Sequence, residues 1–169
     1  MEEEIVNRVA SNQNLITFDL EDYYPQGKRV LFDIKEWLFE GLLLREKDFR
    51  KHVAAHDWSQ YQDQYVALTC STEAIIPGWA YLLLTSSLIP YTKKVVVGSL
   101  EILETILYAE IINDLDVSEY QDKLLIIKGC ANKPVPEGAY ISLIQKLQPV
   151  AKSIMYGEAC SSVPLYKRK

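Results

Sequence analysis

The residues of this chain whose types could do chemistry are three cysteines and one histidine, namely Cys70, Cys130, Cys160 and His56. Thiolate sulfurs bind zinc or iron, and an imidazole nitrogen can complete such a ligand set. No C-x-x-C pair is present, although many structural zinc sites contain one. The sequence therefore favours one shared site for zinc, iron or an iron–sulfur cluster, in an accessory protein that carries, delivers or senses the metal, and it leaves open whether the protein is an enzyme.

Two other interpretations of the thiols stay open. Cys70 or Cys130, placed at a helix N-terminus, could be the nucleophile of a thiol-dependent enzyme with His56 as its base. Free cysteines are also common as small buried hydrophobic residues, which would make the chain a non-catalytic, dimeric interaction module. His52 lies four residues before His56, but the glutamate of an H-E-x-x-H motif is absent, so we assign His52 to a solvated helix face.

The cysteines lie in or next to a duplicated segment. Residues 59–98 align with residues 118–157 without a gap, and duplicated units usually stack to share one core. The residues of the first copy that recur in the second are Ser59, Tyr61, Gln62, Asp63, Pro77, Ala80, Tyr81, Leu84, Leu88, Pro90, Lys93 and Gly98. Cys70 and Cys130 are one residue out of this register, so the two thiols are near-equivalents.

Each copy has the sequence pattern of a strand, a helix and a second strand. Short apolar runs are typical of strands covered on both faces, while a proline is tolerated in the first turn of a helix and stops the helix at its end. The predicted elements are strands 65–69 and 95–98 around helix 78–88, and strands 124–127 and 153–157 around helix 137–147. A further amphipathic helix is expected over residues 99–115. The order favours parallel pairing, which puts Cys70 and Cys130 at the carboxyl ends of strands, where open sheets bind ligands.

The N-terminal region, residues 1–58, has a different pattern. Two alternating apolar segments flank a turn-rich stretch at 24–27 and predict a β-hairpin: Ile16, Phe18 and Leu20 against Val30, Phe32 and Ile34. The nearby acids are expected to protect the hairpin edges: Asp19, Glu21, Asp22 and Asp33. A charged helix should follow over residues 46–55. We expect a single α/β domain, residues 1–169, whose tandem strand-helix-strand units form a mostly parallel sheet with the hairpin and helix packed on it.

Composition excludes several classes of partner. A net charge of −5 and a pI near 5.1 argue against nucleic acid, because phosphate binding relies on clustered Lys and Arg. No apolar stretch approaches a membrane span, and the acidic N-terminus does not resemble a signal peptide, so a cytoplasmic protein is expected. No G-x-G-x-x-G or Walker pattern supports a nucleotide cofactor. An apolar repeat surface is compatible with a homodimer.

Several stretches together resemble a bacterial family catalogued as domain-of-unknown-function family 2480. They are residues 32–35, 46–50, 77–81, 128–130 and 157–167, of which the last contains Gly-Glu-x-Cys-Ser-x-Val-Pro. The likeness covers nearly the whole chain. It brings no reaction with it, but it implies an association with the sulfur-mobilisation machinery, and hence iron–sulfur cluster assembly proteins as partners.

Overall fold

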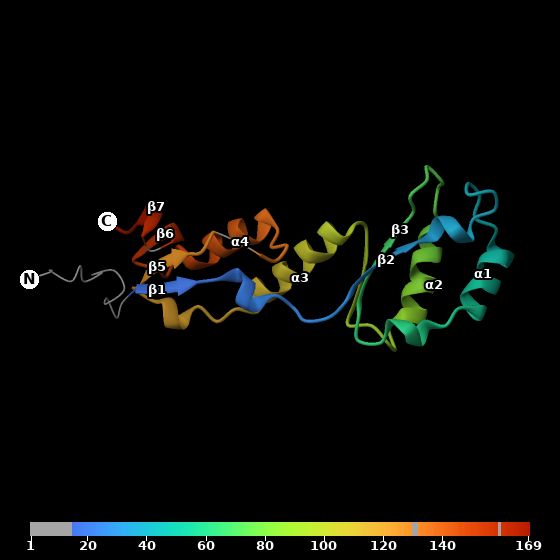
Figure 1. The fold of residues 1–169 in the computed structure, drawn as a ribbon, viewed down its shortest axis with the longest axis horizontal. Helices are drawn as coiled ribbons and strands as arrows, with labels where there is room; N and C mark the ends of the chain where they lie inside the picture. Colours follow the sequence, from blue (N-terminus) through green and yellow to red (C-terminus); the bar gives the residue numbers. More distant parts are fainter. Residues whose placement is uncertain (1–14, 130–131, 159) are drawn as a thin grey trace, which may run out of the picture. The chain divides into compact units, whose positions relative to one another are not determined.

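The computed structural model describes residues 15–129, 132–158 and 160–169. Helices and strands alternate along the chain and form two mostly parallel sheets, which confirms the α/β class predicted from the sequence (Figure 1). The chain divides into two compact units. We call Pro25–Glu104 the inserted unit, and the described residues up to Tyr24 together with Thr105–Lys169 the terminal unit. Each unit contains one sheet, where the sequence suggested a single one; that the two units make up one domain stays a prediction.

The inserted unit is built on a parallel sheet whose order is β2-β3-β4. Its strands are β2 (Arg29–Asp33), β3 (Tyr65–Thr69) and β4 (Lys94–Val97), and its helices are α1 (Glu46–Ala55) and α2 (Gly78–Leu88). Val66 and Leu68 of the central strand are fully buried against α2, which contributes Leu84 and Leu88 to the same core. This burial explains why β3 reads as a continuous apolar run.

The terminal unit has the sheet order β1-β5-β6-β7, in which only the last pair is antiparallel. Its strands are β1 (Leu15–Phe18), β5 (Leu124–Ile127), β6 (Ser153–Glu158) and β7 (Ser161–Lys167), and its helix is α4 (Glu137–Leu147). Figure 1 shows α4 alongside β5 and β6, and Leu125 and Leu143 share one buried core. Helix α3 (Leu100–Asp114) begins in the inserted unit and ends in the terminal unit.

The duplication predicted from the sequence is confirmed in detail. Helices α2 and α4 begin and end at the predicted residues, directly after Pro77 and Pro136. Asp63 and Asp122 both adopt a left-handed backbone, with φ of 58° and 59°. The Asp63 amide donates to the Tyr91 carbonyl at 2.8 Å, and the Asp122 amide donates to the Val150 carbonyl at 2.9 Å. The two copies therefore share their turns as well as their strands and helices.

The predicted N-terminal hairpin is wrong. Both of its strands exist, but β1 pairs in parallel with β5, and β2 pairs in parallel with β3 in the other sheet. A Phe-Asp pair stands at the end of each strand, Phe18-Asp19 and Phe32-Asp33, and each phenylalanine is buried in the core of its own unit. The two segments are thus equivalent first strands of the two copies, and burial against each copy's core outweighs the local turn.

The duplicated unit is accordingly longer than the sequence alignment indicated. Along the sequence, the second copy begins with β1, is interrupted by the inserted unit, and continues from within α3. Among the described residues, no helix has the length and apolar character needed to cross a membrane.

Candidate functional site

The carboxyl edge of the inserted sheet brings Asp33 next to the segment that follows β3. The Asp33 carboxylate accepts the backbone N–H groups of Lys35 at 3.0 Å and of Ser71 at 3.1 Å. Desolvation alone would raise the pKa of Asp33, but the hydrogen bonds from Ser71 and Lys35 outweigh it and hold the pKa below its ordinary value. Asp33 is therefore held as a carboxylate that ties the end of β2 to the end of β3.

Cys70 follows β3 directly, as predicted, and is half-buried. Its sulfur lies 3.3 Å from the Thr72 hydroxyl, and its side chain packs against the core of the inserted unit. Burial raises the pKa of Tyr81, on α2, and the charge of Cys70 raises it further, so thiol and phenol lie within electrostatic reach of each other. The thiol is thus a partly accessible group at the edge where parallel sheets bind ligands.

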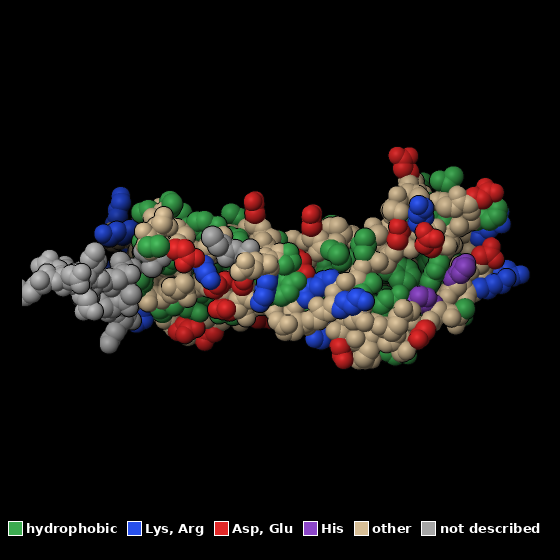
Figure 2. Space-filling model, viewed as in Figure 1, with side chains coloured by type: hydrophobic (Ala, Val, Ile, Leu, Met, Phe, Trp, Pro, Cys, Tyr) green, Lys and Arg blue, Asp and Glu red, His purple; other side chains and the backbone are tan. Residues whose placement is uncertain are grey.

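His56 ends α1 and lies among aromatic rings. Its Nε2 is 2.9 Å from the Tyr61 hydroxyl, and its ring centroid is 4.6 Å from that of Trp58 and 5.3 Å from that of Trp37. Burial lowers the pKa of His56, and the nearby Asp57 offsets this only in part. Figure 2 shows the two histidine side chains on one face of the inserted unit. The ring contacts are those of a packed aromatic cluster.

The carboxyl edge of the terminal sheet is more highly charged. Lys128 follows β5, and its Nζ lies 2.9 Å from the carboxylate of Asp19, which follows β1. Glu21 accepts the backbone N–H groups of Asn132 and Lys133. The Tyr156 hydroxyl, from β6, donates to the Gly129 carbonyl at 3.3 Å. The ends of three neighbouring strands are therefore joined to one another at this edge.

Asp19 and Lys128 shift each other's ionisation. Desolvation would raise the pKa of Asp19, but the hydrogen bonds from Lys128 and from the Glu21 amide lower it overall. The hydrogen bond to Asp19 in turn raises the pKa of Lys128, and the charges of Glu158 and Glu21 add to this. Glu158 therefore lies close enough to Lys128 to influence the same edge.

The predicted ligands are distributed over both units. Cys70 and His56 belong to the inserted unit, whereas Cys160 is exposed in the terminal unit between β6 and β7. Cys130 lies outside the described residues. In the part of the chain that the structure describes, no three His, Cys, Asp or Glu side chains converge as a metal-binding group. Convergence of the four predicted ligands stays a prediction.

Asp19 and Asp33 are site residues whose role the sequence interpretation missed. Both had been assigned to the edges of a hairpin, yet each accepts the N–H two residues later and caps a short 3-10 helix. The signal was present as a second, shorter repeat, because Phe18-Asp19-Leu20 recurs as Phe32-Asp33-Ile34. This shorter repeat precedes residue 59, where the longer repeat begins.

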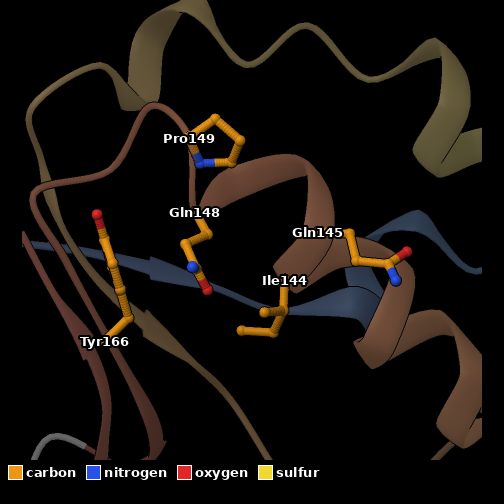
Figure 3. A pocket seen from close by; sticks show the side chains of 5 residues that line it. All are labelled: Ile144, Gln145, Gln148, Pro149 and Tyr166. Carbon is orange, nitrogen blue, oxygen red and sulfur yellow. The ribbon is translucent and has the colours of Figure 1, made fainter.

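An open pocket of about 330 Å³ lies elsewhere on the terminal unit, between the end of α4 and β7 (Figure 3). Its lining is uncharged, with Ile144, Gln145, Gln148 and Pro149 opposite the ring of Tyr166. The pocket contains no thiol, carboxylate or imidazole, so it offers apolar contact and hydrogen bonding only.

In the described residues, the fold is that of an α/β protein made of two copies of a parallel three-stranded unit. The second copy carries an additional antiparallel strand, β7. The family model described as "Protein of unknown function (DUF2480)" matches residues 3–168, and the chain belongs to this family. The resemblance noted in the sequence is thereby confirmed. No curated protein and no solved structure matches the chain.

Proposed function

We propose that this protein is a metal-binding accessory protein that holds zinc, iron or an iron–sulfur cluster through cysteine thiolates at the carboxyl edge of the terminal sheet. The observation that supports this most is the parallel pairing of β5 and β6, in which Ile127 lies opposite Tyr156. Along the chain, Cys130 comes three residues after β5 and Cys160 two residues after β6. Two of the three thiols thus follow the same ends of neighbouring strands.

The charges at this edge suit a metal whose ligands must be anionic. Thiolates and carboxylates are the ligands that zinc accepts, and Glu158 precedes Cys160 by two residues. Lys128, which pairs with Asp19, would balance part of the negative charge of such a set. In this proposal Cys70 and His56 are not ligands, which narrows the site predicted from the sequence to Cys130, Cys160 and a carboxylate.

Metal analysis of single cysteine variants tests the proposal. The protein is purified without air and without a chelating tag, then assayed for zinc and iron and for visible absorption. We expect near-stoichiometric metal in the wild type, loss in Cys130→Ser and Cys160→Ser, and retention in Cys70→Ser, which is the matched control in the other unit. Loss in all three variants would instead support the four-residue site. A wild type that stays metal-free after reconstitution with zinc, or with iron and sulfide, would refute metal binding.

A thiol-dependent enzyme is the second candidate, and the position of Cys70 favours it. The sulfur is half-buried beside the Thr72 hydroxyl at a strand end, before the N-terminus of α2. The measurement is the rate of alkylation by iodoacetamide against pH in Cys130→Ser/Cys160→Ser protein. A nucleophile titrates well below the ordinary thiol range of about 8.5. An ordinary titration at a slow rate would exclude this role for Cys70.

Partners follow from the proposal. A metal or cluster carrier has to exchange its cargo with another protein, so the assembly proteins of iron–sulfur clusters are the partners we propose. Transfer is tested by incubating cluster-loaded protein with an apo-ferredoxin and following the ferredoxin spectrum. A spectrum that does not change, under conditions where free iron and sulfide do assemble the cluster, would argue against delivery.

A further inference from the structure

The two sheets are copies of each other, but they differ by one strand. In the terminal sheet, β7 lies antiparallel on the outer edge of β6. The equivalent strand of the inserted sheet is β4, because Lys93 aligns with Lys152 and Gly98 with Gly157. The inserted sheet ends at β4, and no strand in the described part of the chain pairs with the outer edge of β4. Within the described residues, the inserted sheet thus lacks the strand that its copy carries at this edge.

The way β7 is held shows what such an edge recognises. Backbone pairing runs from Ser153 opposite Lys167 to Glu158 opposite Ser161, and it continues with the Arg168 amide, which donates to the Lys152 carbonyl at 2.9 Å. The aromatic ring of Tyr166 packs against the core beside the end of α4 (Figure 3).

Arg168, directly after β7, closes the contact through its guanidinium. It donates to the carbonyls of Pro149 at 3.2 Å and Val150 at 2.9 Å, and it pairs with the carboxylate of Asp122. We call Asp122, Pro149 and Val150 the arginine-binding turn. Charge-assisted hydrogen bonds of this kind are among the stronger ones in proteins, so Arg168 fixes the end of β7.

The inserted unit contains the same turn. Asp63, Pro90 and Tyr91 align with the three residues of the arginine-binding turn, and the left-handed aspartate and its hydrogen bond to the third residue recur in both copies. Asp63 is exposed, and its carboxylate accepts a bond from the Gln62 side chain at 3.2 Å. The backbone that binds an arginine in one unit is therefore reproduced in the other.

Exposed apolar side chains flank the same edge. Ile89 takes the position of Gln148, beside which Tyr166 lies in the other copy, and it is 66% exposed. Val97, in the last position of β4, is 53% exposed. Natural sheets usually cover or charge their edge strands, because an open edge with apolar neighbours pairs with another chain. An added strand would contact both residues, as β7 contacts Tyr156 in the other copy.

We propose that the outer edge of β4 binds an extended segment of a partner protein, antiparallel to β4, in which an aromatic residue is followed two positions later by arginine. The backbone of the segment pairs with β4, its ring covers Ile89, and its guanidinium binds Asp63 and the carbonyls of Pro90 and Tyr91. This is strand addition with one charged contact that sets register. The occupant is not a second copy, because the described segment with this pattern, β7 with Arg168, is already paired with β6.

The test uses a labelled peptide with the sequence of residues 161–169 and the full-length protein. Binding is followed by fluorescence anisotropy, and we expect saturable binding. Asp63→Asn should weaken it about tenfold, which is the effect of losing one charged hydrogen-bond partner. Asparagine tolerates the left-handed backbone, so this variant keeps the turn. An Arg168→Gln peptide should bind wild-type protein about tenfold more weakly, and Asp63→Asn should not weaken that peptide further.

Asp122→Asn is the matched control in the terminal unit. It should leave peptide binding unchanged, because its carboxylate belongs to the other copy. Sensitivity to Asp122→Asn but not to Asp63→Asn would mean that the peptide replaces β7 on β6, and would overturn the proposal. So would the absence of binding. A dimer that forms as concentration rises and is lost in Val97→Lys would also overturn it, because the edge would then belong to a second copy.

Discussion

The guanidinium of Arg29 and the carboxylate of Glu104 form a two-pronged ion pair, with Nε to Oε1 at 2.6 Å and Nη2 to Oε2 at 3.2 Å. Nη1 of Arg29 also donates to the carbonyls of Pro25 and Gly27, each at 2.6 Å. Only 11% of the Arg29 side chain and 7% of the Glu104 side chain are exposed. Because the inserted unit runs from Pro25 to Glu104, this pair ties its two ends together.

Glu104→Ala should destabilise the inserted unit by about 3 kcal/mol, because it leaves the Arg29 charge buried beside fewer partners. Urea unfolding followed by tryptophan fluorescence measures this, since all three tryptophans, Trp37, Trp58 and Trp79, belong to this unit. The control is Glu46→Ala, which removes the exposed Glu46–Arg50 pair and should cost less than about 1 kcal/mol. Equal effects of the two variants would contradict the role assigned to the buried pair.

His56 should make the stability of the inserted unit depend on pH. Burial lowers its pKa below the ordinary 6.5, so the unfolded chain binds the proton more readily than the folded chain does. The contribution of neutral His56 to the free energy of unfolding is then fully present above about pH 6.5. It is lost as the pH falls from there towards the lowered pKa. The fluorescence-detected urea midpoint, measured from pH 5 to 8, should lose this dependence in His56→Gln and keep it in His52→Gln. A slope that is unchanged in His56→Gln would show that another group is responsible.

Asp33→Ala and Asp19→Ala form a matched pair, because each removes the cap of the short helix that follows the first strand of its copy. Each should cost about 1 kcal/mol, as the loss of a capping carboxylate usually does. If the units unfold separately, Asp33→Ala lowers the midpoint seen by tryptophan fluorescence, and Asp19→Ala lowers only the midpoint seen by far-ultraviolet circular dichroism. If Asp19→Ala shifts the fluorescence midpoint as well, the two units unfold together, as the single domain expected from the sequence would.

Gly157 is needed where β6 turns into β7. Its φ is 120°, and a Cβ there would lie 2.6 Å from the Ser161 carbonyl oxygen. Because this oxygen belongs to the backbone, it cannot move away without distorting the chain. Gly157→Ala should therefore destabilise the terminal unit by about 2 kcal/mol or more, measured by thermal unfolding. The control is Gly138→Ala on α4, where a Cβ meets nothing within 4 Å and alanine should stabilise the helix by about 0.5–1 kcal/mol. A neutral Gly157→Ala would contradict the strain described.

Helices and strands were predictable from the sequence because their signals are local. Pro77 and Pro136 mark helix starts that the structure reproduces, and the apolar runs of β3 and β5 give strands at the predicted residues. The partners of β1 and β2 were not predictable in the same way. Alternation identifies a strand and its buried face, but here the choice of neighbour depends on residues far along the chain.

The candidate site was predictable only in part. The position of Cys70 at a strand end follows from the repeat, whereas the surroundings of His56 depend in part on Trp37, which reaches it from an earlier segment of the chain. From its position in the sequence, His56 was predicted to be a metal ligand or a general base. In the fold its imidazole lies among aromatic side chains. The role of Arg168 was not predictable, because a basic residue near a chain end is expected to be solvated. Its hydrogen bonds to the carbonyls of Pro149 and Val150 depend on the fold.

The pairing of β1 with β5 has a consequence for how the chain is made. Leu15 lies opposite Leu124, so β1 leaves the ribosome long before its neighbour is synthesised. The strands β2, β3 and β4 follow one another within the inserted unit and can complete their sheet during that interval. Synthesis therefore favours an order of folding in which the inserted unit forms first and β1 waits, unpaired, for the second half of its own copy.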